Sequence, residues 1–172
     1  MEDTRPEPLE IERKFLIRMP DRAVLERESE RFIDMEQIYL LSEDGSSRRI
    51  RRSICGGEET LYFTEKVFVT HFTRVERERE IGPREWSALL EQADPSRRPI
   101  VKRRWCVPYA GHTLEIDVFP FWDDRAFCEA ELASETEPLE LPGWIRVVRE
   151  VTEDPRYTNS ALARELPAEE LP

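Results

Sequence analysis

The sequence has 172 residues, the length of one ordinary domain rather than two. Charged residues make up 37% of it and apolar residues 39%, so the chain can bury a core but carries more charge than solubility alone requires. Its net charge of −11 opposes general binding to nucleic acid or to anionic lipid, although a local basic cluster could still hold a phosphate.

The terminal segments and the cysteines indicate where the protein is located and how its chain is organised. No apolar run approaches the roughly 20 residues of a membrane span, and the charged start lacks the apolar core of a signal peptide. We therefore expect a cytoplasmic protein with neither a nucleic-acid nor a membrane partner. Prolines and charges predict flexible tails over 1–8 and 167–172, with one domain over 9–166. The cysteines form no Cys-x-x-Cys pair and are expected to be reduced: Cys55, Cys106 and Cys128.

Most of the predicted elements are strands. The residue Asp21 is a candidate cap for a helix over 22–30, and the pair Gly56-Gly57 predicts a hairpin turn. A second helix is predicted after Gly82-Pro83, where apolar residues recur at helical spacing, and Asn159 or Ser160 is a candidate cap for a short third one through Leu166. Alternation and turn signals predict eight strands, over 9–17, 37–41, 47–54, 60–68, 74–81, 101–108, 113–119 and 127–132.

These elements favour a mainly β (α+β) fold. Short connections suit consecutive antiparallel strands, and closing the sheet removes the exposed edges that eight strands would otherwise present. We therefore predict a closed eight-stranded antiparallel β-barrel with a few flanking helices.

Charged residues fall on one face of each predicted strand. Side chains two positions apart in a strand share a face, so the alternation separates charged from apolar positions in seven segments. For a single strand the charged face would ordinarily be solvated, but these faces group by sign and the predicted helices are too small to cover a wide open sheet. If the charged faces turn inward, the interior holds Lys14, Arg49, Arg51, Lys66, Arg74, Lys102, Arg104, Glu10, Glu12, Glu76, Glu78, Glu80, Glu115, Asp117, Glu129 and Glu131.

Such an interior has to be wet and has to bind ions of both signs. An unpaired ion in a dry interior costs on the order of tens of kcal/mol in the Born limit. A small polyanion with divalent cations satisfies both sets of charges.

An ordered set of motifs carries a resemblance to a known family. The chain resembles the CYTH superfamily, also called triphosphate tunnel metalloenzymes, over about residues 9–163. The motifs, in the family's order, are Glu10-Ile11-Glu12-Arg13-Lys14, Arg49-Ile50-Arg51, Thr64-Glu65-Lys66, Arg74-Val75-Glu76-Arg77-Glu78, Lys102-Arg103-Arg104-Trp105, Leu114-Glu115-Ile116-Asp117, Glu129-Ala130-Glu131-Leu132 and Asp154-Pro155-Arg156-Tyr157-Thr158-Asn159-Ser160.

The resemblance implies roles for individual residues. The basic residues would clamp phosphate oxygens: Arg49, Arg51, Lys66, Arg74, Lys102 and Arg104. Carboxylates would hold Mg²⁺ or Mn²⁺, with Glu10, Glu12, Glu129 and Glu131 first and Glu78 and Asp117 next. It also implies that Lys14, with Tyr39, could tune the attacking water, although a lysine among acids favours its charged form and a water activated by the metal is the simpler interpretation.

The implied activity is metal-dependent hydrolysis of a phosphoanhydride bond, with inorganic tripolyphosphate as the preferred substrate. One alternative is another enzyme of the same architecture, a nucleoside or thiamine triphosphatase or a class IV-type adenylate cyclase, which would need an organic pocket at one tunnel mouth. The other is a non-catalytic polyphosphate-binding module, against which both acid pairs argue.

Overall fold

The computed structural model describes residues 11–68 and 74–172, and its strands form one nine-stranded antiparallel sheet. The strands occur in the order β5-β4-β3-β2-β6-β7-β8-β1-β9 across the sheet. The elements are β1 (Ile11–Arg18), α1 (Arg22–Glu28), β2 (Arg31–Leu40), β3 (Ser46–Cys55), β4 (Glu58–Phe68), β5 (Arg74–Ile81), α2 (Pro83–Leu90), β6 (Ile100–Tyr109), β7 (His112–Val118), β8 (Arg125–Leu132), β9 (Val147–Glu150), a 3₁₀ turn η1 (Pro155–Tyr157) and α3 (Asn159–Leu162).

Tight two-residue turns set the register of two hairpins. Gly56 and Gly57 both have positive φ, 58° and 83°, between β3 and β4. Positive φ at both central residues is the backbone of a type I′ turn, whose twist matches that of paired strands. Ala110 and Gly111 make the equivalent turn between β6 and β7, with φ of 47° and 82°.

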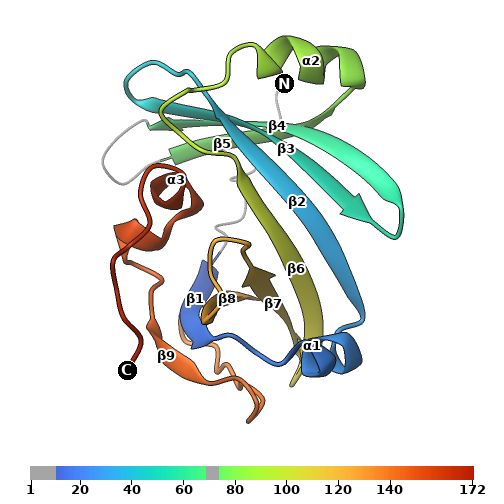
Figure 1. Cartoon of the computed structure of the whole chain (residues 1–172), viewed down its shortest axis with the longest axis vertical. Coiled ribbons are helices and arrows are strands. Elements are labelled where there is room, and N and C mark those ends of the chain that lie inside the picture. Colours follow the sequence, from blue (N-terminus) through green and yellow to red (C-terminus); the bar gives the residue numbers. More distant parts are fainter. Residues whose placement is uncertain (1–10, 69–73) are drawn as a thin grey trace.

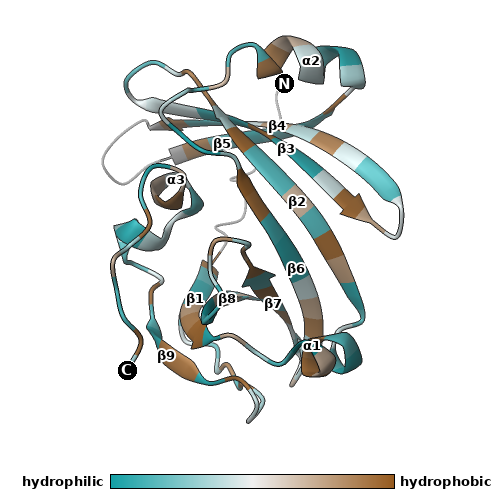
Figure 2. Ribbon diagram, viewed as in Figure 1, coloured by the Kyte–Doolittle hydropathy of each residue, from teal (hydrophilic) through white to brown (hydrophobic). Residues whose placement is uncertain are grey.

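Helices α1 and α2 cover the apolar face of the sheet at opposite ends (Figure 1). Leu25 of α1 packs into a core that includes Ile17 and Trp105. Leu89 of α2 packs against Ile50, among other buried strand residues. Along β2 and β6, hydrophobic and hydrophilic stretches follow one another (Figure 2).

The C-terminal region packs on the other face of the sheet. Tyr157 of η1 and Leu162 of α3 are fully buried in a core with Leu16 of β1, Tyr39 of β2 and Phe127 of β8. Because Leu16 and Tyr39 meet although several strands separate them in the sheet order, the sheet curls around this second core.

Closure of the sheet is not confirmed. Within the described residues, β5 pairs only with β4 and β9 pairs only with β1, so the sheet has two edges instead of the predicted continuous ring. The ninth strand, which the sequence analysis lacks, occupies the outer edge of β1 through pairs such as Phe15 with Glu150. Strand β1 therefore has a paired strand on both sides, although the sheet is not closed.

At the ends of the elements, the structure confirms some of the predicted positions and corrects others. The first helix begins after the predicted cap, with Asp21 accepting a hydrogen bond from the backbone N–H of Ala23, and the second begins at the predicted Pro83. Strand β2 starts six residues before the predicted 37, because it pairs with both β3 and β6 and Phe32 packs against Trp105. Thr158, not Asn159 or Ser160, caps α3. The three cysteines are unpaired thiols.

Candidate functional site

Those of the predicted charged positions that the structure describes lie on one face of the sheet. Cross-strand pairs connect them in rows, such as Tyr39 with Arg49, Arg49 with Thr64 and Thr64 with Glu78. On the other half of the sheet, Arg104 pairs with Asp117 and Lys14 pairs with Glu129. Two groups of ion pairs result, one on each half.

The first group is centred on Arg104. Its Nε and Nη2 donate to the two oxygens of Asp117 at 2.7 and 2.8 Å, and Nη2 also donates to Glu129 at 3.1 Å. Glu115 pairs with the remaining guanidinium nitrogen. Lys102 donates to Asp117 at 2.5 Å, and the two side chains are 2% and 0% exposed. We call Lys14, Lys102, Arg104, Glu115, Asp117 and Glu129 the Arg104 cluster.

Burial and charge act in opposite directions within this cluster. Burial alone would raise the pKa of Asp117, but the attraction of Lys102 and Arg104 outweighs it and leaves that pKa below its usual value. Burial lowers the pKa of Lys102 against the attraction of Asp117. Burial likewise opposes the charge of Arg104, yet hydrogen bonds to Asp117 keep its pKa above the usual value. Asp117 is therefore ionised, and hydrogen bonds from Lys102 and Arg104 hold its carboxylate in place.

Lys14 is held by three different groups. Its Nζ donates to the backbone carbonyl of Tyr157 at 2.8 Å, lies 3.3 Å from a carboxylate oxygen of Glu129, and sits 4.1 Å from the centre of the Phe127 ring. The C-terminal region thus fixes the one lysine to which the sequence analysis assigns a role in tuning water.

Glu12 lies beside this cluster, directly opposite Glu131 on the neighbouring strand. Neighbouring groups displace part of the water around the Glu12 carboxylate, and this effect, followed by the charge of Glu129, raises the pKa of Glu12 to about 7. The charges of Lys14 and Arg104 act in the opposite direction. Like charges directly opposite on neighbouring strands destabilise a sheet. A divalent cation would relieve the repulsion among these carboxylates.

The second group lies on β3, β4 and β5. Arg51 donates to Glu78 at 3.1 Å, and Thr64 donates to the other oxygen of that carboxylate at 2.8 Å. Lys66 lies 2.9 Å from Glu76, and Arg49 is 3.8 Å from the same carboxylate. We call Arg49, Arg51, Lys66, Glu76 and Glu78 the Arg51 cluster.

The Arg51 cluster contains donors that lack acceptors. The Nε atoms of Arg49 and Arg51 are buried, and neither has a hydrogen-bond partner in the part of the chain that the structure describes. The Oε1 atom of Gln37, a 3% exposed residue paired with Arg51, is a buried acceptor that lacks a donor within the same ranges. Gln37 is not among the predicted site residues, because it stands at the first position of its predicted strand, where no alternation precedes it.

The predicted metal ligands are distributed over both groups. Asp117, Glu78 and Glu129 all have basic partners, while Glu12 and Glu131 lie opposite one another on the paired strands β1 and β8. Glu10 is outside the described residues, as is the side chain of Arg74. Among residues 11–68 and 74–172, no three His, Cys, Asp or Glu side chains form a group that could hold a metal ion. No helix in these ranges is both long and apolar enough to cross a membrane.

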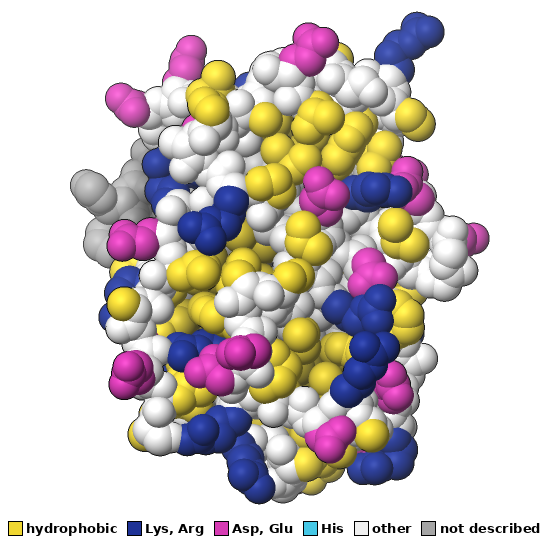
Figure 3. All heavy atoms as spheres, viewed as in Figure 1, with side chains coloured by type: hydrophobic (Ala, Val, Ile, Leu, Met, Phe, Trp, Pro, Cys, Tyr) yellow, Lys and Arg dark blue, Asp and Glu magenta, His cyan; other side chains and the backbone are white. Residues whose placement is uncertain are grey.

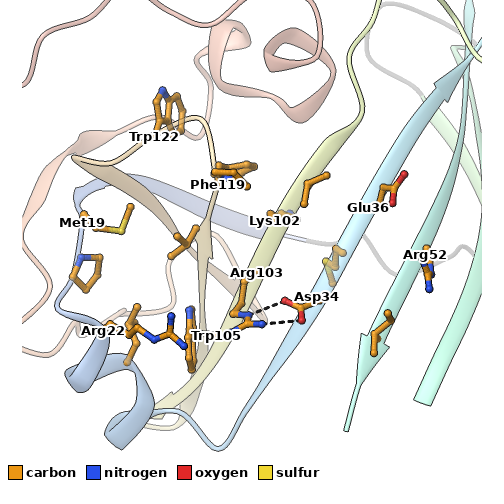
Figure 4. Close-up of a pocket in the computed structure, with 17 residues that line it drawn as sticks. Met19, Arg22, Asp34, Glu36, Arg52, Lys102, Arg103, Trp105, Phe119 and Trp122 are labelled. Atoms are coloured by element: carbon orange, nitrogen blue, oxygen red, sulfur yellow. Dashed lines mark hydrogen bonds and ion pairs between the residues drawn. The ribbon is translucent and has the colours of Figure 1, made fainter. Parts of the chain in front are cut away.

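An apolar pocket of about 700 Å³ opens on the other face of β2 and β6 (Figure 4). Arg103 donates to both oxygens of Asp34 there, at 2.7 and 2.9 Å, and Trp105 and Trp122 line it. It extends to Lys102, where β7 no longer pairs with β6. On the surface seen in Figure 3, hydrophobic side chains lie between charged ones. The sequence analysis missed this pocket, because its walls come from five separate segments.

Comparisons with known proteins agree on the family. A family model described as the CYTH domain matches residues 8–158. A curated inorganic triphosphatase of Acetivibrio thermocellus is 32% identical over 162 residues, which are 90% of this chain and 93% of that protein.

Two solved structures are also similar. The inorganic triphosphatase NE1496 is 29% identical, with a TM-score of 0.59 over 92% of this chain and 96% of that one. A structure described as the hypothetical protein NE1496 has a TM-score of 0.60 and 29% identity, over 92% of this chain and 99% of that chain.

Proposed function

Because the chain belongs to the CYTH domain family, we propose that it is a metal-dependent hydrolase that cleaves a phosphoanhydride bond of a triphosphate, with inorganic tripolyphosphate as substrate. The observation that carries the proposal is the Arg51 cluster, where the Nε atoms of Arg49 and Arg51 are buried without acceptors among the described residues. A buried donor without an acceptor costs about 1–3 kcal/mol, so these atoms favour a ligand rich in anionic oxygens.

The two ion-pair groups would contribute differently to binding. Arg49, Arg51 and Lys66 each pair with a single, partly exposed carboxylate, so phosphate oxygens can add to or replace their carboxylate partners. Arg104 is held by three carboxylates and cannot reorient without breaking several bonds. It would meet developing charge with its direction already fixed, which is how electrostatic catalysis avoids a reorganisation cost.

The carboxylates beside the Arg104 cluster have the chemistry that Mg²⁺ or Mn²⁺ requires. Glu12, Glu129 and Glu131 would supply hard oxygen donors from two adjacent strands, with the predicted ligand Glu10 as a fourth, and they would have to draw together around the ion because the described residues hold no preformed group of three. A bound divalent ion would neutralise charge on the transferred phosphoryl group and lower the pKa of a water molecule. Asp117 would instead hold Lys102 and Arg104 in place.

Lys14 and Tyr39 would act by orientation. The carbonyl of Tyr157 and the carboxylate of Glu129 fix the Lys14 ammonium, so it presents its remaining donor capacity in one direction. Burial raises the pKa of Tyr39, against the nearby charges of Arg49 and Arg97, so its hydroxyl keeps its proton at neutral pH. It would donate a hydrogen bond to the substrate or the water rather than remove a proton.

An organic triphosphate is the second candidate, because the apolar pocket on the other face extends to Lys102. A pocket of about 700 Å³ with two tryptophans has the size and character of a site for a flat organic group. A nucleoside or thiamine triphosphate would have to place its phosphates on the charged face and its organic part around the end of β7.

Phosphate release from a substrate panel tests both candidates. Purified protein is assayed with tripolyphosphate, pyrophosphate, ATP and thiamine triphosphate, with Mg²⁺ and Mn²⁺ each supplied and with a chelator. Tripolyphosphate should be cleaved at least as fast as ATP, and pyrophosphate should react poorly because it reaches fewer cations. Arg51→Ala should raise KM and lower kcat together, while Arg77→Ala, an exposed residue of β5, should leave both unchanged.

Three results would redirect the proposal. A strong preference for ATP or thiamine triphosphate would replace the inorganic substrate with an organic one. Tight binding of tripolyphosphate without cleavage would favour a binding module. Full activity in chelator would remove the metal from the mechanism.

A further inference from the structure

We propose that Arg97 is a further binding residue for the substrate polyanion, located beside Tyr39 on the charged face. The proposal rests on the proposed function, since it takes the ligand to be a chain of phosphates. Arg97 lies in the connection between α2 and β6, not in a strand, so strand alternation assigned it to no face.

The backbone around Arg97 is fixed on both sides. The N–H of Asp94 donates to the carbonyl of Tyr39 at 2.9 Å, and the N–H of Arg98 donates to the carbonyl of Ala163 at 2.8 Å. The connection therefore runs between β2 and the end of α3, and Figure 1 shows it as the segment that leads from α2 into β6. A side chain from this position reaches the charged face without belonging to the sheet.

The guanidinium of Arg97 lies against the ring of Tyr39, with 5.0 Å from its carbon to the ring centre. Its Nη1 donates to the hydroxyl of Ser160 at 3.0 Å, which is a neutral acceptor. Its own acid is a poor partner, because the nearer oxygen of Asp94 is 3.5 Å from Nε and the other oxygen already accepts two hydrogen bonds from Ser96. The Nε atom is buried and has no hydrogen-bond partner among the residues that the structure describes.

Arg49 makes this arrangement a two-cation site. Arg49 is the cross-strand neighbour of Tyr39, and Arg97 lies against the Tyr39 ring, so both arginines border one buried residue. The carboxylate nearest to Arg49 is 3.8 Å away, and its Nε also lacks a partner within the described ranges. An anion that reaches both guanidinium groups would fill these donors and be attracted by both charges.

Other arginines show that an unpaired Nε is not a general property of the described residues, although Arg125 leaves its buried Nη1 without a partner. Arg103 and Arg104 each direct Nε and a second nitrogen to the two oxygens of one carboxylate. By contrast, Arg49, Arg51 and Arg97 share the buried, unpaired Nε. We infer that these three guanidinium groups form one phosphate-binding surface, to which the loop contributes one member.

The test compares four variants of the full-length protein. Arg97→Ala removes the guanidinium, and Arg97→Lys keeps a charge without the forked donors. Arg98→Ala is the matched control, because Arg98 is the adjacent exposed arginine. Ser160→Ala keeps Arg97 but removes its contact with α3, which separates anion binding from support of the helix.

Two measurements are made on each variant: steady-state kinetics with tripolyphosphate, and calorimetric binding of tripolyphosphate without metal at several salt concentrations. Arg97→Ala should weaken binding and raise KM by about ten- to hundredfold, since a charge-assisted hydrogen bond is worth about 1.5–3 kcal/mol. It should also reduce the dependence of binding on salt, whereas Arg98→Ala and Ser160→Ala should resemble the unmodified protein. Arg97→Lys should recover part of the loss, and added guanidinium ion should partly restore Arg97→Ala.

The outcomes separate this inference from the proposed function. If the unmodified protein binds and cleaves tripolyphosphate but Arg97→Ala behaves like Arg98→Ala, the assignment of Arg97 is wrong and the function stands. If Ser160→Ala reproduces the loss seen in Arg97→Ala, Arg97 supports α3 and does not bind the anion. If the unmodified protein does not bind tripolyphosphate at all, the proposed function fails and this inference fails with it.

Discussion

At the scale of single residues, the pair of Lys102 and Asp117 shows how the fold fixes charge inside the sheet. Both side chains are almost completely inaccessible, and Asp117 also accepts two hydrogen bonds from Arg104. Removing one member of such a pair leaves a buried charge without compensation. Replacing only one of the two side chains therefore costs more stability than replacing both with apolar ones.

Asp117→Asn should destabilise the protein by about 3 kcal/mol or more, because it leaves the charge of Lys102 buried beside that of Arg104. Urea unfolding at neutral pH measures the change. A double variant, Lys102→Met with Asp117→Leu, should lose less stability than the single variant, because it removes both buried charges. A loss below about 1 kcal/mol in Asp117→Asn would show that Lys102 is hydrated or gives up its proton in the variant.

At Glu12, one substitution should change stability and turnover in opposite directions. Glu12→Gln should raise the melting temperature at pH 8 in a chelator, because above its raised pKa of about 7 the carboxylate repels Glu129 and Glu131. Turnover should fall by about tenfold or more, since a proposed ligand of the cation is lost.

The metal response is the control for Glu12. Mg²⁺ or Mn²⁺ should raise the melting temperature of the unmodified protein more than that of the variant, because only the former has the full donor set. Equal shifts in both proteins would remove Glu12 from the metal site. Glu36→Gln, on the opposite face of β2, should leave the metal response unchanged.

At the scale of elements, the C-terminal region is tied to the sheet by charge. Arg149 of β9 donates to both oxygens of Glu169 at 3.1 and 3.0 Å, and the hydroxyl of Tyr157 also donates to this carboxylate. The segment 167–172, predicted to be a flexible tail, thus includes a residue with three hydrogen bonds. Through Tyr157, the same contacts lead to the carbonyl that holds Lys14.

Acid should loosen this region first. The hydrogen bonds from Arg149 and then Tyr157 lower the pKa of Glu169 to about 2, from an ordinary value of about 4.5. Because the folded pKa is the lower one, the stabilisation is complete above about pH 4.5 and is lost as the pH falls towards 2. Hydrogen exchange of α3 and η1 between pH 5 and 3 should show it, and Glu169→Gln should exchange faster at pH 5 with less pH dependence. Unchanged exchange in the variant would mean that apolar packing alone holds the segment.

Sequence alone predicted most strands and the composition of their faces, and the reasons are local. Alternation along a strand assigns Arg49, Arg104 and Glu129 to one face without knowledge of their neighbours. The pairing of β9 with β1 is different, because a four-residue strand has little pattern and its partner is more than a hundred residues away. Arg97 and the apolar pocket were missed for the same reason, since loops and multi-segment walls have no periodicity.

At the scale of the whole molecule, the two faces of one sheet serve different purposes. The apolar face is stabilised by α1 and α2, and the charged face is stabilised in part by η1 and α3. The roles of the charged residues also could not be read from alternation. It placed Asp117 and Glu129 together, but only the contacts show that Asp117 is occupied by Lys102 and Arg104 while Lys14 faces Glu129.

The position of β1 between β8 and β9 has a consequence during synthesis. The ribosome makes β1 first, yet its two neighbours in the sheet end at Leu132 and Glu150. At about 5–20 residues per second, β1 waits on the order of 10 s for either partner. For that time Phe15, Leu16 and Ile17, all buried in the finished protein, are exposed on a strand with two open edges. The nascent chain is therefore most open to chaperone binding, or to pairing with a neighbouring nascent chain, at the same strand that later carries Glu12 and Lys14.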